Sequence, residues 1–212
     1  MHYTKEEIAE LDKVARLKLI NAVSGIKAAN LIGTISKEGV SNLGVFNSVF
    51  HLGSNPPLQG FILRPVDEVP RHTYENFIEN GQYTINHIHS GMIERAHYTS
   101  AKFEADVSEF SECGLTEEYV AGFEAPFVKE SRLKMGMRFI KAIPIPMNDT
   151  LMIVGEIQHL MLPENAYGEA EDVDLERMDA VGISGLNTYY EVKKLKRFPY
   201  ARRSEVPNFK DR

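Results

Sequence analysis

The sequence predicts a mainly β protein, an antiparallel barrel that is closed or partly open, with helices at its periphery. Predicted strands outnumber predicted helices, and short connections favour antiparallel pairing over a parallel crossover. No internal repeat or long linker divides the 212 residues, so we expect a single domain over residues 1–212. A domain of this size buries roughly 70% of its unfolded surface and needs no covalent staple.

The N-terminal part of the chain predicts one helix followed by strands. Thr4 and Glu7 form a capping box, and apolar residues then recur at helical spacing, which predicts a helix over about residues 4–19. β-rich runs at 28–36 and 40–52 flank a Lys-Glu-Gly turn and predict a hairpin. Two prolines at 56–57 then interrupt the ladder, before a third strand at 58–63.

The rest of the chain alternates short helices with strands. The pattern predicts a helix over 72–80 that stops at Gly81, a strand over 82–89 and a second short helix over about 91–101. Residues 106–134 are expected to be rich in loops. Strands are predicted at 135–145 and 151–162, an acidic solvated stretch at 164–179, a last strand within 181–192, and a basic tail over about 193–212.

Composition and missing motifs exclude several classes of function. The chain has 24 Lys and Arg against 30 Asp and Glu, so its charge of -6 disfavours general nucleic-acid or anionic-membrane binding. Apolar runs are shorter than the roughly 20 residues of a membrane span and no secretory signal is visible, so a cytoplasmic protein without a membrane partner is expected. The motifs of serine hydrolases, P-loop enzymes, zinc proteases and Rossmann dinucleotide binders are missing.

Three other features have an ordinary interpretation that we favour. His87 and His89 share one face of a predicted strand, but hydrogen-bonded histidines are favoured over a metal site, so no metal is predicted. Cys113 has no basic neighbour to activate it. Six positive charges within 193–203 indicate a solvated or intramolecularly paired tail, which is favoured over a nucleic-acid contact.

Two segments favour a small-molecule site. Residues 44–57 are rich in Asn and Ser and end at a proline corner, so they present N–H groups and hydroxyls to a planar heterocycle. Residues 97–101 offer further hydroxyls to the polar edge of a ring, although Ser and Thr also simply terminate helices.

A third segment favours a phosphate. Arg64 and residues 71–73 place two guanidinium groups and a hydroxyl at the start of a predicted helix, where free N–H groups and the helix dipole attract an anion. The alternative is that these arginines only balance Asp67 and Glu68 in the intervening loop.

Taken in order, several short motifs form a series that is quite specific as a whole. They are Asn-Leu-Ile-Gly-Thr at 30–34, Phe-Asn-Ser-Val-Phe at 46–50, Asn-Pro-Pro at 55–57, Arg-His-Thr-Tyr-Glu-Asn-Phe at 71–77, Gly-Gln-Tyr-Thr-Ile-Asn at 81–86, Thr-Ser-Ala at 99–101, Glu-Phe at 109–110, Gly-Leu-Thr at 114–116 and Met-Ile-Val-Gly-Glu-Ile at 152–157. From about residue 28 to 190, the chain resembles the flavin reductase-like, FMN-binding split-barrel family.

The resemblance implies a six-stranded split barrel and a homodimer with FMN at or near the subunit interface. It implies that the isoalloxazine lies against 46–50, that the phosphate lies at Arg64 and 71–73, and that 99–101 close the other edge of the ring. The implied FMN contacts are Phe46, Asn47, Ser48, Val49, Phe50, Arg64, Arg71, His72, Thr73, Thr99, Ser100 and Ala101. His72 stands where many relatives have an acidic residue, and the chain is longer at both ends.

The implied activity is reduction of flavin by NADH or NADPH, with free flavin or a flavin-dependent monooxygenase as acceptor. Because the flavin itself carries the hydride chemistry, no catalytic acid–base pair is required and no catalytic residue is assigned. Two alternatives remain: a flavoredoxin-like FMN electron carrier without NAD(P)H turnover of its own, and a split-barrel scaffold that has lost its cofactor.

Overall fold

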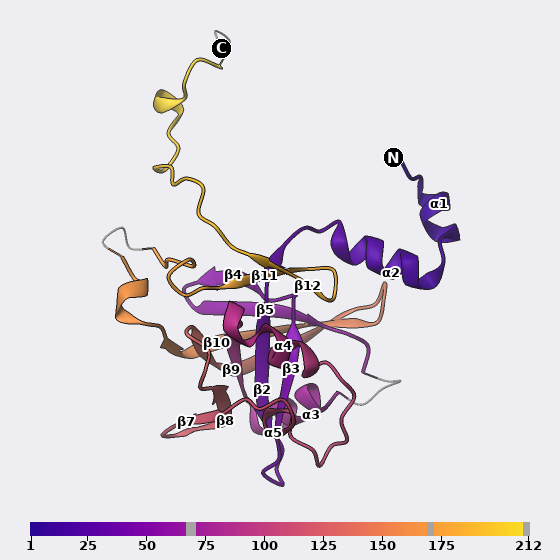
Figure 1. The fold of residues 1–212 in the computed structure, drawn as a ribbon, viewed down its shortest axis with the longest axis vertical. Helices are drawn as coiled ribbons and strands as arrows, with labels where there is room; N and C mark the ends of the chain where they lie inside the picture. Colours follow the sequence, from indigo (N-terminus) through magenta and orange to yellow (C-terminus); the bar gives the residue numbers. More distant parts are fainter. Residues whose placement is uncertain (67–70, 169–171, 210–212) are drawn as a thin grey trace.

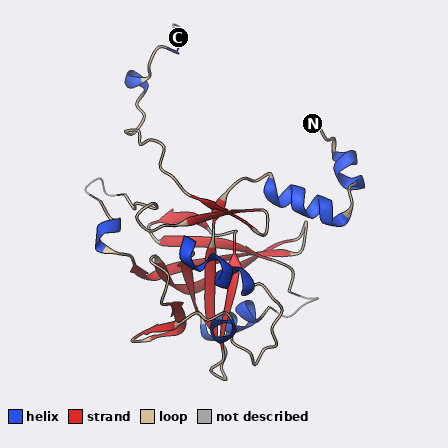
Figure 2. Ribbon diagram, in the orientation of Figure 1, coloured by secondary structure: helices blue, strands red, loops and turns tan. Residues whose placement is uncertain are grey.

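The computed structural model describes residues 1–66, 71–168 and 172–209, and its body is a strongly curved antiparallel sheet (Figures 1 and 2). This confirms the predicted mainly β architecture with peripheral helices. The sheet has seven strands in the order β3-β2-β6-β9-β10-β5-β4, so a count of six is not confirmed. The strands are β2 (Asn30–Ile35), β3 (Ser41–Phe46), β4 (Phe50–Ser54), β5 (Pro57–Leu63), β6 (Gln82–His87), β9 (Lys134–Ile145) and β10 (Thr150–Met161).

The two edge strands of this sheet follow one another in the sequence. β3 and β4 lie at opposite ends of the strand order, yet only residues 47–49 connect them. Four Cα-to-Cα steps span at most about 14 Å, so the edges must approach each other and the sheet curls into an open barrel. The gap between β3 and β4 is therefore the split of the barrel.

The split corrects the strand predicted over 40–52. That run ends at Phe46, and β4 forms a hairpin with β5 instead of extending the β2–β3 hairpin. The Ser48 hydroxyl donates to the Ile62 carbonyl at 3.0 Å and accepts from the Ile62 N–H at 3.2 Å. The Ser48 side chain thereby satisfies the backbone N–H and carbonyl of Ile62 in β5, where a neighbouring strand would otherwise pair. These bonds stabilise the interruption between β3 and β4.

A hydrophobic core fills the barrel. Phe61, Phe77 and Tyr83 are fully buried there, with ring centroids 5.3 to 6.2 Å apart. Phe77 comes from α3 (His72–Asn80), which ends at Gly81 in the left-handed conformation, as predicted. Burying these rings contributes about 2–3 kcal/mol each, so the core fixes α3 and the strands that frame the split.

Smaller elements cover the outside of the barrel (Figure 2). The predicted second helix consists of η1 (Ser90–Met92) and α4 (Ile93–Tyr98), and the predicted last strand is a hairpin. Residues 106–134, predicted as mostly loop, contain a helix and a hairpin that turns at Gly122, with φ 79°. These elements are α5 (Glu109–Glu112), β7 (Glu117–Val120), β8 (Phe123–Val128), β11 (Val181–Ser184) and β12 (Thr188–Glu191), with β1 (Lys27–Ala28) paired to β11.

The N-terminus forms two helices, not the single helix predicted over 4–19. The capping box of Thr4 and Glu7 starts α1 (Lys5–Glu10), as expected. Asp12 then caps a second helix, α2 (Lys13–Ala22), by accepting hydrogen bonds from the N–H groups of Val14 and Ala15 at 2.9 and 3.2 Å. These bonds also lower the pKa of Asp12, and they stabilise a new helix start where a continuous helix was expected.

Two single turns complete the fold, η2 (Glu164–Ala166) and η3 (Arg203–Glu205) in the C-terminal tail. Across the described ranges, every helix is too short or too polar to cross a membrane. The predicted tail over 193–212 is described as far as residue 209.

Candidate functional site

A pocket of about 540 Å³ lies beside the split of the barrel. Its walls come from β3 and the 47–48 link on one edge, from the end of β5 on the other, from the start of α3, the end of α4, the start of α5 and the β11–β12 turn. The lining positions are 42–48, 62–64, 71–73, 97, 99–101, 109, 183, 186 and 187.

The structure brings most of the predicted binding residues together in this one pocket. Phe46, Asn47, Ser48, Arg64, Arg71, His72, Thr73, Thr99, Ser100 and Ala101 all line it. Val49 and Phe50 do not: Val49 packs against the barrel core, and Phe50 begins β4 and pairs with Gly60. The role of each residue in binding FMN stays a prediction.

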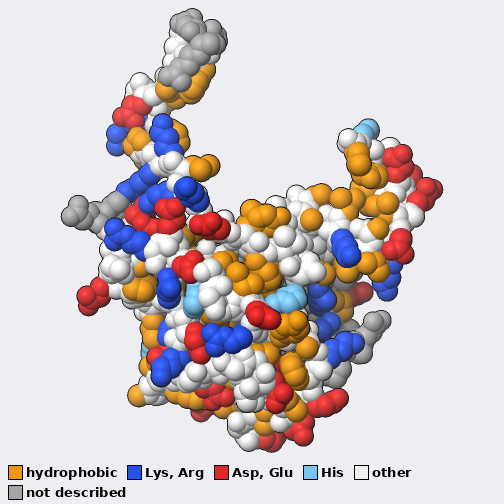
Figure 3. Space-filling view, viewed as in Figure 1, with side chains coloured by type: hydrophobic (Ala, Val, Ile, Leu, Met, Phe, Trp, Pro, Cys, Tyr) orange, Lys and Arg blue, Asp and Glu red, His pale blue; other side chains and the backbone are white. Residues whose placement is uncertain are grey.

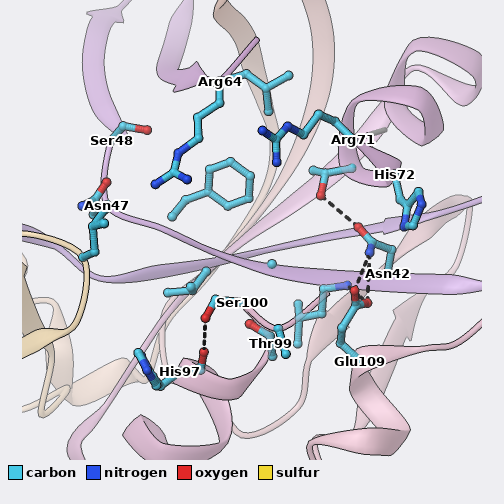
Figure 4. Close-up of a pocket in the computed structure, with 18 of the residues that line it drawn as sticks. Asn42, Asn47, Ser48, Arg64, Arg71, His72, His97, Thr99, Ser100 and Glu109 are labelled. Atoms are coloured by element: carbon cyan, nitrogen blue, oxygen red, sulfur yellow. Dashed lines mark hydrogen bonds between the residues drawn. The ribbon is translucent and has the colours of Figure 1, made fainter. Parts of the chain in front are cut away.

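Two guanidinium groups define one side of the pocket. In Figure 4, Arg64 and Arg71 lie on the side of the pocket opposite His97 and Ser100; Arg71 extends toward Arg64, and Arg64 extends toward Asn47. Arg71 Nε donates to the Pro65 carbonyl at 3.3 Å, which holds this side chain in place. Asp67 and Glu68, the alternative partners of these arginines, lie outside the described residues.

The start of α3 lies beside the arginines. Arg71 is its N-cap residue and makes no side-chain capping bond. Among the described residues, the N–H groups of His72 and Thr73 therefore have no hydrogen-bond acceptor. Together with the two guanidinium groups, these N–H groups make this side of the pocket suited to an anion.

The side-chain donors expected to meet a ring are used inside the protein. Asn47 Nδ2 donates to the Gly185 carbonyl at 2.6 Å and so ties the β11–β12 turn to the split. The Thr99 and Ser100 hydroxyls donate back to carbonyls of α4 at 2.8 and 2.7 Å, which is the helix-terminating role considered as the alternative. Together with the Ser48 bonds described above, these contacts show that the polar side chains shape the pocket wall.

The backbone of the same link has free hydrogen-bonding capacity. Across the described residues, the N–H groups of Asn47, Ser48 and Val49 donate no hydrogen bond. Because β3 has ended and β4 has not begun, neither neighbouring strand uses these groups. Of these three residues, Asn47 and Ser48 line the pocket, so they bring free main-chain donors to its edge.

A buried carboxylate, which no local sequence pattern predicts as a site residue, forms the opposite end of the pocket. Glu109 is only 5% exposed and accepts two hydrogen bonds of 2.9 Å from Asn42 Nδ2 and one of 2.8 Å from the Leu43 N–H. Burial raises the pKa of Glu109, and the bonds from Leu43 and Asn42 and the charge of His72 partly offset that rise. The motif at 109–110 was noted, but no local pattern links position 109 to position 42.

The same network reaches the start of α3. Asn42 Oδ1 accepts a hydrogen bond of 2.9 Å from the Thr73 hydroxyl (Figure 4). The proton of this hydroxyl therefore points to Asn42, and its oxygen is left as an acceptor. Thr73 thus contributes a main-chain N–H to the anion side and a side-chain acceptor to the pocket.

The histidine and cysteine side chains outside the pocket are scattered among the described residues. Among the described residues, no three His, Cys, Asp or Glu side chains are placed to hold a metal ion. Burial lowers the pKa of His87 to about 4, so this side chain is neutral at physiological pH. Burial likewise raises the pKa of Cys113, which keeps the thiol protonated.

Fold and site together define an open antiparallel barrel with a pocket at its split, and Arg64 and Arg71 line one side of that pocket. The flavin reductase like domain model matches residues 26–179. A candidate flavin reductase with a split barrel domain from Shewanella frigidimarina NCIMB 400 is 47% identical, covers 95% of this chain and 100% of its own, and superposes with a TM-score of 0.91. The chain therefore belongs to the flavin reductase like domain family, and its fold is a split barrel.

Two more distant structures share the fold. Nitrilotriacetate monooxygenase component B from Bacillus cereus is 18% identical, covers 93% of this chain and 98% of its own, and gives a TM-score of 0.82. Flavoredoxin of Desulfovibrio vulgaris (Miyazaki F) is 21% identical, covers 83% and 92%, and gives a TM-score of 0.71.

Proposed function

We propose that this chain binds FMN in the pocket at the split and reduces flavin with NADH or NADPH. The observation that carries this proposal is the distribution of free donors in one pocket. Two guanidinium groups and the start of α3 lie on one side, and the main-chain N–H groups of Asn47 and Ser48, which donate no hydrogen bond among the described residues, lie at an edge.

The pocket fits this cofactor in size and chemistry. Its volume of about 540 Å³ lies within the range typical of small-molecule sites. Arg64 and Arg71 would hold the phosphate through charge-assisted hydrogen bonds, and the N–H groups of Asn47 and Ser48 would bond the polar edge of the ring system. Leu43, Val45 and Leu186 supply apolar walls for the ring faces.

Bound FMN supplies the hydride chemistry by accepting a hydride from the nicotinamide. The residues of this chain bind and orient the cofactor, and the apolar walls exclude water from part of it. The deep side of the pocket is closed by Glu109 and Asn42, so the nicotinamide would approach from the open side. No acid–base residue of the chain is required.

The proposal includes a cytoplasmic homodimer with FMN at or near the subunit interface. Free flavin or a flavin-dependent monooxygenase would accept the electrons. The likeness to a protein described as component B of a monooxygenase supports the second acceptor. No nucleic acid or membrane partner is part of the proposal.

A second candidate is an electron carrier that holds FMN tightly and exchanges electrons with a protein partner. The shared fold with a flavoredoxin favours it. Both candidates require the same FMN contacts, so the pocket supports each of them.

A turnover assay separates the two candidates. The chain, loaded with FMN, is mixed with NADH or NADPH and excess free FMN under air-free conditions, and loss of nicotinamide absorbance is followed. Sustained oxidation over many turnovers is expected for the reductase. Tight FMN binding with oxidation limited to one equivalent would contradict the reductase and support the carrier.

A further inference from the structure

Two segments extend from the body of the molecule (Figure 1). The N-terminal arm, residues 4–26, contains α1 and α2, in which no residue is buried. The C-terminal tail, residues 193–209, follows β12. In Figure 1 both segments leave on the same side of the barrel and diverge from one another, so the arm does not lie on the tail of its own chain.

The N-terminal arm exposes apolar side chains along α2. Six of the ten residues of α2 are Ala, Val, Leu or Ile, and they are spread around the helix. Val14, Leu17 and Ile20 are 55%, 46% and 48% exposed, and Figure 3 shows hydrophobic side chains along this arm. Helices that are apolar on several sides are normally buried, so another surface must cover α2.

The tip of the arm is acidic. Residues 1–12 contain one basic side chain with a permanent charge, Lys5, and four acidic ones: Glu6, Glu7, Glu10 and Asp12. Glu7 and Asp12 cap the two helices and are already used. Glu6 and Glu10 are exposed on the surface of α1 and are free of any such capping role.

The tail has the opposite character. Residues 193–203 hold six Lys and Arg side chains and no acidic one. Leu195, Phe198 and Tyr200 are 94%, 70% and 85% exposed between these charges. Lys194 and Arg197 approach Asp172 at 4.0 and 3.7 Å, which fixes the base of the tail on the barrel.

We propose that the N-terminal arm of one copy of this chain docks on the C-terminal tail of a second copy. The apolar side chains of α2 pack against Leu195, Phe198 and Tyr200, and the acidic tip faces the basic residues. By two-fold symmetry each contact forms twice, so both arms and both tails are covered in one dimer. This inference rests on the homodimer of the proposed function and specifies how its subunits hold each other.

A second copy explains both segments at once. Nucleic acid would pair with the basic tail but would repel the acidic arm and leave α2 exposed. A membrane surface would meet the same objection. These other occupants are therefore outcomes that the experiment must be able to reveal.

Reciprocal charge reversal in the full-length chain tests the contact. We expect E6K/E10K and K193E/K196E each to raise the dimer dissociation constant about tenfold at low salt, as measured by sedimentation velocity. The combined E6K/E10K/K193E/K196E chain restores tight dimers, because each reversed arm meets a reversed tail. E38K/E104K, which changes net charge as E6K/E10K does at exposed positions elsewhere, leaves the constant unchanged.

Zero-length cross-linking of carboxylates to amines gives a second measurement. Dimers are formed from a mixture of ¹⁴N and ¹⁵N chains, and cross-linked peptides are analysed by mass spectrometry. Peptides that join Glu6 or Glu10 to Lys193 or Lys196 are expected in mixed-isotope pairs, which form only between two chains. Cross-links found only within one isotope would overturn the proposal.

The other possible results also decide whether the arm docks on the tail of a second copy. A monomeric wild-type chain, or single reversals without effect, would contradict the docking. If the combined variant does not recover tight dimerisation, the tail is excluded as the surface on which the arm docks. Tail-dependent binding of an RNA oligonucleotide by a monomer would show instead that nucleic acid is the partner of the tail. Because FMN binding is titrated in the same samples, loss of the dimer contact and failure of the flavin proposal are seen separately.

Discussion

Glu109 and Asn42, which are 67 positions apart in sequence, form a buried pair at the closed end of the pocket. Both carboxylate oxygens of Glu109 accept from Asn42 Nδ2 at 2.9 Å. A carboxylate that only accepts forces the amide nitrogen toward it, so Asn42 Oδ1 must face Thr73. One carboxylate thereby sets which way the hydrogen bonds run from α5 through β3 to α3.

Glu109→Gln is expected to destabilise the fold and reverse this direction. The new amide brings a donor against the amide of Asn42, so the bond is lost or Asn42 flips and the Thr73 hydroxyl becomes free to donate. Losing hydrogen bonds to a buried charged group costs about 1.5–3 kcal/mol. Urea unfolding measures this cost, and Glu112→Gln on the exposed side of the same helix is the matched control. Equal stability of the two variants would contradict the structural role of Glu109.

Arg71→Ala is expected to weaken FMN binding by about 1–3 kcal/mol, because it removes a charged donor from the phosphate. Riboflavin, which has no phosphate, should bind the variant and the wild-type chain alike. Calorimetric titration with both ligands measures the difference. Arg132→Ala, an exposed arginine away from the pocket, serves as control. An equal loss for riboflavin and FMN would show that Arg71 does not hold the phosphate.

Gly155→Ala is expected to disrupt the barrel core. A Cβ at this position would lie 2.0 Å from the Tyr83 hydroxyl and 3.2 Å from the Arg138 carbonyl. Such overpacking costs about 1–3 kcal/mol. The cost should shrink in a Tyr83→Phe background, since the hydroxyl is the nearest obstacle. Additive effects of the two substitutions in thermal unfolding would show that the contact is not the cause.

Tyr83→Phe alone is expected to leave stability unchanged or to raise it by up to about 1 kcal/mol. The Tyr83 hydroxyl is buried without a hydrogen-bond partner in the described part of the chain, and burial raises its pKa. Removing an unsatisfied buried hydroxyl removes its desolvation cost. A clear loss in free energy of unfolding would reveal a bond that this hydroxyl makes.

Stability should fall as the pH drops from about 6.5 toward 4, because of His87. Its pKa is lowered from 6.5 to about 4 by burial, so the unfolded chain binds a proton in this window and the folded chain does not. The contribution is on the order of 3 kcal/mol at the lower end of the window. Glu109, whose pKa is raised, has the opposite sign: the stability that it contributes is present below pH 4.5 and is lost as the pH rises through its folded value.

The pH dependence is measured by urea unfolding between pH 4 and 7.5. His87→Gln should flatten the slope in this range more than His89→Gln, because His89 is less buried and the charge of Asp179 opposes the lowering of its pKa. An unchanged slope in the His87 variant would assign the effect to other groups.

Local patterns predicted the strands and the start of α3, but not how residues distant in sequence meet. The alternation of apolar residues with other residues predicted β9 and β10, and Gly81 predicted the end of α3. The break at 47–49 was not predicted, because Ser48 replaces a strand partner through a contact with Ile62, 14 positions away. Asp12 divides the N-terminal helix by capping, a local signal that apolar periodicity concealed.

In the candidate site, too, the sequence predicts residues that lie close together in the chain and misses those that tertiary packing brings in. Residues near the arginines were predicted because a helix start and positive charges lie together in sequence. Glu109 and the 185–187 turn were not, since they reach the pocket only through tertiary packing. Both main-chain and side-chain contacts were expected at Asn47, Ser48 and Thr99. Their side-chain donors bond to other parts of the protein, which could only be seen once their partners were placed.

A visible absorption titration of the full-length chain with FMN, followed by gel filtration, tests directly whether flavin binds at the split. Binding at the split predicts shifted flavin bands, saturation at one FMN per chain and co-elution of the yellow colour with the protein. A chain that leaves the FMN spectrum unchanged and elutes colourless would contradict the account.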